Sequence, residues 1–472
     1  MKTKILSVLL CAVMIFCAVP LSVYAEDDLS GDFSEEIIAY ADEVAKAALA
    51  YEDGYEFDSA IPLQTLADIM HVVHYEYPEL FCISTTYDYY YITDPWGTQY
   101  ARKVMFRYTI TEDEYAAAMA EVDQWSDGIM SLTDPDFTDL EYLLFFHDYL
   151  CANYEYDLTY TVYRLYDFIK LRKGVCEAYT LAMTVLLEKA GIESSFATST
   201  AMNHAWNIVK IDGEWYHVDT TWDDPVGISP GMAYHTYFLK SDSAIQSLAK
   251  PHHSWESIYT CTSATYDNGV LDNPDSPYTY TDGSWYYIKN YDLYVSDTPD
   301  MAGTMYKDLN LYWRVNGNPT SVYVGYFGGL VAYDGKLYLN SSGKVIEIDT
   351  ATGETVDVYT HTDSDSKIYG FIMDLGEGNI LTDCSSGYAT LNIATAPREV
   401  VGSVNVKLFD TEVIIPGDVN GDGAVTGADI SLLLRLLTSG GVMSKGADVD
   451  CNGRIDATDA GILYRRLSGG AA

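Results

Sequence analysis

The most informative part of the chain reads Gly174-Val-Cys-Glu-Ala-Tyr179, then His204-Ala-Trp-Asn207, then Gly213-Glu-Trp-Tyr-His-Val-Asp-Thr-Thr-Trp-Asp-Asp-Pro225. The first segment places Cys176 at the start of an expected amphipathic helix over residues 176–190. The unpaired N–H groups and the dipole at a helix N-terminus stabilise a thiolate. Cys176 is therefore a candidate nucleophile.

The other two segments predict a β-hairpin. Its strands are His204–Ile211 and Glu214–Thr220, joined by the two-residue turn Asp212-Gly213. This register puts His204 and Asp219 on one face as diagonal neighbours, about 7–8 Å apart. The carboxylate can then hold the imidazole while the imidazole exchanges a proton with a thiol.

His217 is an alternative histidine, because it points to the same expected face as Lys210. A slip of one residue in the register would separate His204 from Asp219, since alternate side chains face opposite ways.

Cysteine, histidine and aspartate in this chain order resemble the transglutaminase-like superfamily, a papain-related group. The resemblance covers residues ~34–255 and implies a papain-like α+β core with Cys176, His204 and Asp219 as the catalytic triad. The further matching segments are Tyr77-Pro-Glu-Leu-Phe81, His147-Asp-Tyr, Tyr156-Asp, Leu186-Leu, Gly191-Ile and Tyr237-Phe-Leu.

The chemistry that the resemblance implies is acyl transfer at an amide carbon. Water as the second substrate gives a peptidase or amidase, and a lysine amine gives a protein cross-linking transglutaminase. We favour hydrolysis. A third alternative is a non-catalytic carbohydrate-binding or adhesion protein that binds through exposed tyrosines and tryptophans of residues 265–405.

Two twelve-residue segments near the C-terminus, 418–429 and 448–459, match a calcium-binding loop. Calcium takes six to eight oxygen ligands, and alternate side chains of a tight loop converge on one point. The pattern predicts two Ca²⁺ ions and folding that requires them. The candidate ligands are Asp418, Asn420, Asp422, Asp429 and the carbonyl of Ala424 in the first loop, and Asp448, Asp450, Asn452, Asp456, Asp459 and the carbonyl of Arg454 in the second.

Each loop precedes a helix, and the unit is duplicated. Position 12 is Asp rather than the Glu of an ordinary EF-hand, and Pro416-Gly417 precludes a long entering helix. Residues ~416–468 resemble a type I-like dockerin of cellulosome-type assemblies. The resemblance implies a cohesin module of a scaffold protein as partner, contacted through the helices that follow the loops, for example at Leu434-Arg435 and Tyr464-Arg465.

The expected organisation is a multidomain α+β protein. It consists of a signal peptide (1–25), an α+β lead-in region (26–138), the transglutaminase-like core (139–262), an all-β domain (263–410) and the small α calcium-binding dockerin (416–468). Asp-Gly, Ser-Gly and Thr-Gly turns between Tyr-rich runs predict the all-β domain to be a small β-sandwich or several propeller-like blades.

Composition limits the partners and the location. The formal charge of −42 over 472 residues disfavours nucleic acid. The apolar start predicts secretion without a lipid anchor or a second membrane span, so the protein is expected outside the cell on a scaffold or cell surface. The cysteines are sparse and imply no disulfide framework. We find no glycosidase carboxylate pair, phosphate loop or zinc spacing.

Overall fold

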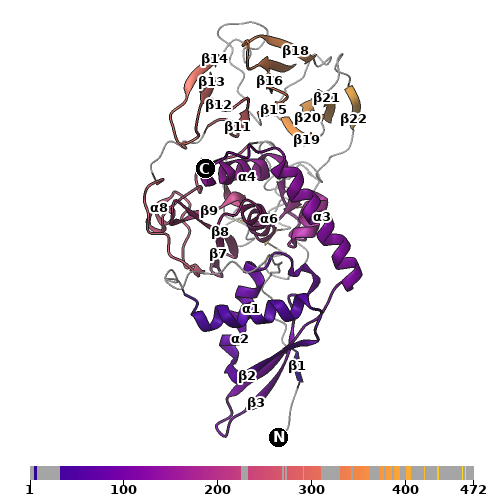
Figure 1. The fold of residues 1–472 in the computed structure, drawn as a ribbon, viewed down its shortest axis with the longest axis vertical. Coiled ribbons are helices and arrows are strands. Elements are labelled where there is room, and N and C mark those ends of the chain that lie inside the picture. Colours follow the sequence, from indigo (N-terminus) through magenta and orange to yellow (C-terminus); the bar gives the residue numbers. More distant parts are fainter. Residues whose placement is uncertain are drawn as a thin grey trace. The chain divides into compact units, whose positions relative to one another are not determined.

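The structure is a computed structural model, and the chain divides into two compact units, residues 1–405 and 406–472. The described parts of the chain are residues 5–7, 32–224, 232–267, 271, 274–290, 292–309, 330–341, 344–360, 372–376, 379–384, 387–393 and 400–404, with positions 419, 433, 434, 460 and 463. Mixed helices and several separate sheets confirm the multidomain α+β class (Figure 1).

The lead-in region is a four-stranded antiparallel sheet covered by two helices. Its strand order is β1-β3-β4-β2, and α1 packs on both α2 and β2. Ser34 caps α1 by accepting a hydrogen bond from the backbone N–H of Ile37. Strand β1 falls inside the segment expected to be a signal peptide. The elements are β1 (Ile5–Ser7), α1 (Glu35–Leu49), β2 (Gly54–Pro62), α2 (Leu63–Glu76), the 3₁₀ turn η1 (Leu80–Cys82), β3 (Asp88–Thr93) and β4 (Gln99–Met105).

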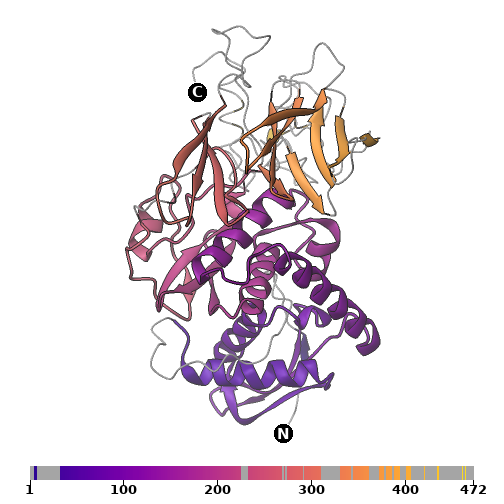
Figure 2. The ribbon, with the colours of Figure 1, turned by 45° about the horizontal axis from the view of Figure 1, so that its top comes forward.

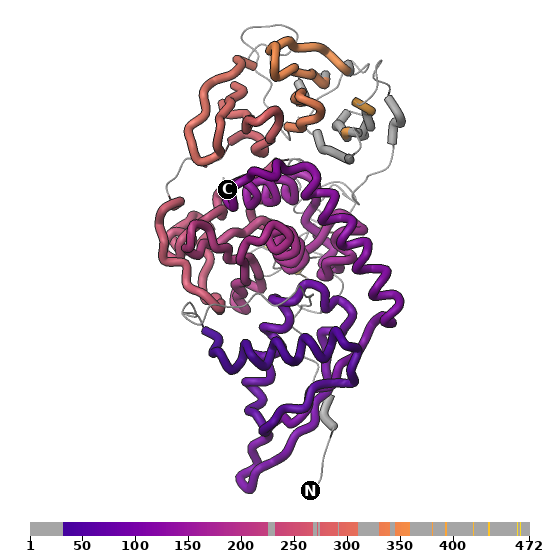
Figure 3. The backbone as a smooth tube through the Cα atoms, viewed as in Figure 1, coloured from indigo at the N-terminus to yellow at the C-terminus, as the bar shows by residue number. Residues whose placement is uncertain are grey.

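The core that follows is built around one central helix, α6. This helix packs against β8 on one side and against α3, α4 and α5 on the others, and most of its side chains are buried (Figures 1 and 3). Capping boxes begin both α3 and α4. The elements are α3 (Glu112–Met130), α4 (Asp139–Asn153), β5 (Glu155–Tyr156), α5 (Leu165–Leu171), β6 (Lys173–Gly174), α6 (Cys176–Lys189), β7 (Ser194–Ser199), β8 (His204–Ile211), β9 (Glu214–Val218), α7 (Thr220–Asp223), α8 (Asp242–Ser247) and β10 (Glu256–Ser257).

The core sheet has the antiparallel order β10-β7-β8-β9. The β8–β9 register, from Ile211↔Glu214 to Asn207↔Val218, is the predicted one, and Asp212 and Gly213 form the turn with φ of +54° and +82°. The second strand ends at Val218, two residues earlier than predicted. The chain leaves the ladder there because the Asp219 side chain caps the short helix α7.

The described residues of the all-β region form three four-stranded antiparallel sheets, each in sequential strand order. Their first strands β11, β15 and β19 lie beside one another, and β19 packs on α4, so the sheets form propeller-like blades (Figures 1 and 2). The blades are β11 (Thr279–Thr281), β12 (Ser284–Lys289), β13 (Asp292–Ser296) and β14 (Thr304–Asp308); β15 (Val331–Tyr333), β16 (Lys336–Ser341), β17 (Lys344–Asp349) and β18 (Thr355–Thr360); β19 (Ile372–Gly376), β20 (Asn379–Cys384), β21 (Gly387–Asn392) and β22 (Val400–Val404).

The first blade is packed onto the core. The Trp285 indole N–H donates to Glu141 at 3.0 Å, and its ring stacks on Phe137. The Tyr278 backbone N–H donates to Asp148 at 2.6 Å. Trp285 is fully buried, so the blade and α4 share one apolar core.

Five positions of the C-terminal unit are described. Leu433 and Leu463, which occupy equivalent places in the two repeats, are both fully buried, and Leu434 is half exposed. All the predicted calcium ligands, from Asp418 to Asp459, lie outside the described residues. Within the described parts, no helix has both the length and the apolar character that crossing a bilayer requires.

Candidate active site

Cys176 is the first residue of α6, as predicted. No side chain caps this helix terminus, so its N–H groups and dipole act on the sulfur. Gly174 sets the approach: a Cβ there would lie 2.6 Å from both the Ala178 Cβ and a ring carbon of Phe168. The Val175 N–H donates to the Val162 carbonyl at 2.9 Å. The close packing at Gly174 and the Val175 hydrogen bond thus fix the position of the helix start.

His204 begins β8 and lies between the thiol and a carboxylate. Its Nε2 is 2.6 Å from Asp219 Oδ2, which leaves Nδ1 for the hydrogen bond with Cys176. Burial opposes the charged imidazole, but Asp219 and the Cys176 sulfur raise the pKa of His204 to about 10. The relative solvent exposure is 9% for Cys176 and 6% for His204, so the pair lies just below the surface.

Asp219 is fully buried and stays ionised. Burial raises the pKa of this carboxyl, but His204 and a second histidine, His252, hold it well below its usual range. Its other oxygen, Oδ1, accepts the Trp222 N–H at 3.1 Å as the cap of α7. The structure therefore brings Cys176, His204 and Asp219 together, although Asp219 arrives as a helix cap and not as a strand residue.

The alternative histidine, His217, is occupied elsewhere. Its Nδ1 accepts the Trp206 indole N–H at 2.9 Å, and its Nε2 lies 2.8 Å from Asp242. It is fully buried. Both ring nitrogens are used in packing the sheet, so His217 is not available as a base.

His252 was not found from the sequence. Its Nε2 lies 2.7 Å from the same Asp219 oxygen that binds His204. The residue follows α8 in an irregular loop, where no periodicity or spacing marks it. The pair His252-His253 in front of Trp255 is the only sequence signal nearby.

A second buried cluster supports the end of α7. His147 contacts Asp148 at 2.7 Å and Asp223 at 3.4 Å, and His235 contacts Asp148 at 2.7 Å. Burial opposes the charge on His147, but Cys151, Asp148 and Asp223 raise its pKa well above the ordinary value. Since Asp223 is the last residue of α7, this cluster fixes the helix that Asp219 begins.

Three groups in the described residues have ligand atoms close enough for a metal ion: the fully buried ones around Asp148 and Asp219, and one around the partly exposed Asp242. In each, imidazole N–H groups already meet a carboxylate at hydrogen-bond distance. Hydrogen bonding alone accounts for these arrangements.

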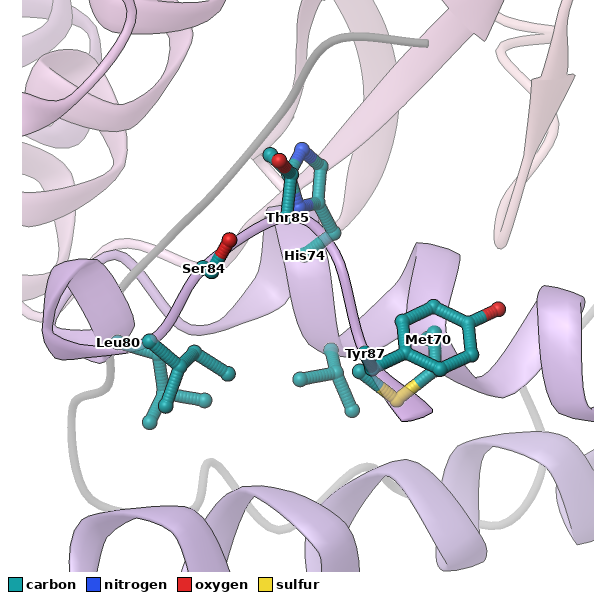
Figure 4. Close-up of a pocket in the computed structure, with 8 residues that line it drawn as sticks. Met70, His74, Leu80, Ser84, Thr85 and Tyr87 are labelled. Atoms are coloured by element: carbon teal, nitrogen blue, oxygen red, sulfur yellow. The ribbon is translucent and has the colours of Figure 1, made fainter. Parts of the chain in front are cut away.

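A small cavity is lined in part by His74, which contacts Glu177, the residue after Cys176. His74 Nε2 is 3.6 Å from Glu177 Oε1. The cavity volume is about 30 Å³, room for a water molecule or two but not for a peptide. Met70, Leu80, Ser84, Thr85 and Tyr87 complete the labelled lining in Figure 4.

The comparisons with known proteins agree with both predicted families. Residues 123–220 match the family model of the transglutaminase-like superfamily, and residues 416–468 match that of the type I dockerin domain. The chain thus carries a transglutaminase-like domain and a type I dockerin, a module type that binds calcium and cohesins.

Individual relatives are distant. Human kyphoscoliosis peptidase is 24% identical over 130 residues, which cover 23% of this chain and 20% of the relative. The chain thus spans a fifth of that protein. Among solved structures, one titled as a TGase is 13% identical with a TM-score of 0.22, and the match covers 37% of this chain and 46% of that chain. Another solved structure is the extracellular domain of a B. thetaiotaomicron protein assigned to the one-component systems. It is 13% identical with a TM-score of 0.23, and the match covers 44% of this chain and 23% of that chain.

Proposed function

We propose that this protein is a secreted cysteine hydrolase that cleaves amide bonds in proteins or peptides and is attached to a cohesin-bearing scaffold through a dockerin loaded with two Ca²⁺ ions. One observation carries the proposal. A thiol at a helix N-terminus, an imidazole and an ionised carboxylate stand in series, with the imidazole raised to a pKa of about 10.

The first half of the proposed reaction forms an acyl-enzyme. His204 already holds the proton, because its pKa lies near 10, so the Cys176 sulfur bonds to the amide carbon as a thiolate. The tetrahedral oxyanion is stabilised by the N–H groups at the start of α6. His204 then gives its proton to the amine nitrogen, the C–N bond breaks, and a thioester remains on Cys176.

The second half returns the free enzyme. Water attacks the thioester carbon as His204 takes one of its protons. The C–S bond breaks, the carboxylic acid leaves, and the proton stays on His204 beside the restored thiolate. Asp219 stays ionised throughout and keeps the imidazole oriented.

Hydrolysis is favoured over cross-linking by the human relative, whose name identifies it as a peptidase. The binding alternative is disfavoured by burial. Trp285, Tyr286, Tyr287 and Tyr338 of the β region are buried and cannot contact carbohydrate, whereas Tyr280, Tyr294 and Tyr306 are partly exposed.

The first test is alkylation of the thiol by iodoacetamide at pH 7 in the full-length protein. Cys176 should react faster than Cys82, Cys151 and Cys261, which are also free. Since Cys176 is slightly more exposed than these, the deciding control is His204→Ala. An unchanged Cys176 rate in that variant would refute activation by the imidazole.

The second test separates the two acyl transfers. Casein is incubated with a fluorescent primary amine and either wild type or Cys176→Ala. Peptides released only by wild type support hydrolysis, whereas amine incorporated into casein supports cross-linking.

A further inference from the structure

His252 shares the catalytic carboxylate with His204. The two imidazole Nε2 atoms lie 2.7 Å and 2.6 Å from one oxygen, Asp219 Oδ2. His252 is fully buried, and the two rings are 5.4 Å apart and nearly perpendicular. Two N–H donors on one oxygen fix both the position and the charge of the carboxylate.

The surroundings of His252 keep its ring neutral. Trp206, Trp222 and Tyr237 enclose it, with ring centroids 4.6, 4.5 and 5.0 Å away. Its Nδ1 is buried and has no hydrogen-bond partner among the described residues. Protonation of Nδ1 would bury an unpaired charge, so the ring is held as the Nε2–H tautomer, which donates to Asp219.

The loop that carries His252 is anchored from three directions. The His252 backbone N–H donates to the Ile245 carbonyl of α8 at 3.2 Å, and the Ser199 hydroxyl donates to the His253 carbonyl at 2.8 Å. The Tyr237 hydroxyl donates to the Lys250 carbonyl at 3.0 Å. These three hydrogen bonds hold the backbone on both sides of His252 and so restrict the movement of its ring.

We propose that His252 is a positioning residue of this site: it donates a fixed hydrogen bond to Asp219 and so limits how strongly that carboxylate holds the His204 proton. The inference rests on the proposed function. The role differs from that of a catalytic residue, because His252 acts on the reacting thiol only through Asp219 and His204.

The titratable groups that face this carboxylate come from every element around it. They are Cys176 of α6, His204 of β8, and His252 and Tyr237 of the adjoining loops, while His217 of β9 acts on His252. Burial lowers the pKa of His252, and its bond to Asp219 only partly offsets this. Neutral His252 therefore withdraws charge density from Asp219 without adding a second positive charge.

The test compares His252→Phe, which keeps an aromatic ring but loses the donor, with His252→Gln, which keeps an N–H donor. His253→Phe is the matched control, since His253 is exposed and its ring contacts only Ser254 among the described interactions. The full-length proteins are alkylated at Cys176 with iodoacetamide from pH 5 to pH 11. A second assay follows acylation of Cys176 by p-nitrophenyl acetate.

In His252→Phe, the upper inflection of the alkylation profile, where His204 loses its proton, should move up by about half a pH unit or more, because the carboxylate holds that proton more strongly. Acylation should slow roughly tenfold, because the carboxylate is less firmly placed. His252→Gln should recover most of both effects. An unchanged inflection and acylation rate in a folded His252→Phe protein would overturn the proposal.

A measurement on the wild type covers the case in which His252→Phe does not fold. The ¹⁵N shifts of His252 should show one neutral Nε2–H tautomer from pH 5 to pH 9. Titration of His252 near the ordinary value of about 6.5 would overturn the proposal. Failure of the enzyme proposal is seen separately, as equal Cys176 reactivity in wild type and His204→Ala.

Discussion

Replacing Asp219 by asparagine tests how much of the thiol's activation comes from the carboxylate. The change preserves shape, and asparagine is an equally good helix cap, so the bond to the Trp222 N–H survives. What is lost is the negative charge beside His204. That charge is the largest influence raising the pKa of the imidazole from 6.5 to about 10, against the burial that lowers it.

Without the charge, burial should bring the pKa of His204 to or below 6.5. The group carries a proton in the wild type at all pH values below about 10, so its positive charge stabilises the thiolate across the neutral range. In Asp219→Asn the imidazolium fraction at pH 7.5 should fall to about a tenth or less, since each pH unit above the pKa is a factor of about ten. Turnover should fall by roughly 10³–10⁴, the size of effect known for His–Asp pairs in serine proteases.

The assay is iodoacetamide alkylation of Cys176 at pH 7.5 and pH 9.5, followed by mass spectrometry. We expect Asp219→Asn to react at least about tenfold more slowly at pH 7.5, where its imidazolium fraction has fallen to about a tenth, and to approach the wild type at pH 9.5. Asp242→Asn is the matched control, because it breaks a partly buried His–Asp pair, with His217, away from the thiol. Equal rates at pH 7.5 for Asp219→Asn and wild type would refute the reasoning.

Three further outcomes follow from other parts of the chain. Gly174→Ala should destabilise the fold by roughly 1–3 kcal/mol in thermal unfolding, because its methyl group meets Ala178 and Phe168 at 2.6 Å; an unchanged melting temperature would contradict this packing. Burial raises the pKa of Glu155 to about 8, so its contribution to stability is complete below about pH 4.5 and is lost as the pH rises through 8. Glu155→Gln should therefore be more stable than wild type by roughly 4–5 kcal/mol at pH 8.5, since a pKa raised from 4.5 to about 8 corresponds to about 1.4 kcal/mol per pH unit, and nearly equal at pH 4.5, as measured by urea unfolding; the opposite pH trend would exclude the shift. Chelation of calcium should abolish cohesin binding and expose residues 416–468 to protease while leaving Cys176 alkylation unchanged, because the dockerin belongs to a separate compact unit; retained cohesin binding in excess chelator would contradict the calcium requirement.

The sequence was most informative where a local pattern fixes the geometry. Helix α6 begins at the predicted residue, because Gly174 and Val175 end the preceding segment there. The β8–β9 register followed from the Asp212-Gly213 turn, which allows little choice of pairing.

Features set by long-range packing were beyond such patterns. Strand β2, at residues 54–62, has an irregular burial pattern and was missed. The helical turn α7 replaced the expected end of a strand because Asp219 caps it. The contact of His252 with Asp219 joins residues 33 positions apart in sequence, and only the tertiary fold brings them together.

The choice between a sandwich and blades also needed the structure. Alternating Tyr-rich runs with Asp-Gly turns are common to both architectures. What distinguishes them is the pairing, which here closes after every four strands. The burial of Trp285 also could not be predicted from the sequence, since Phe137, on which its ring stacks, is distant along the chain.

The most direct measurement of the central claim is acylation of the thiol by an activated ester, which needs no knowledge of the natural substrate. Wild type is mixed with p-nitrophenyl acetate at pH 7, quenched at intervals, and the acyl group is located by mass spectrometry. The account predicts an acetyl group on Cys176 that forms rapidly and then hydrolyses, is absent from Cys176→Ala, and forms far more slowly in His204→Ala. Acylation at other residues only, or at the same rate on Cys176 in His204→Ala, would contradict it.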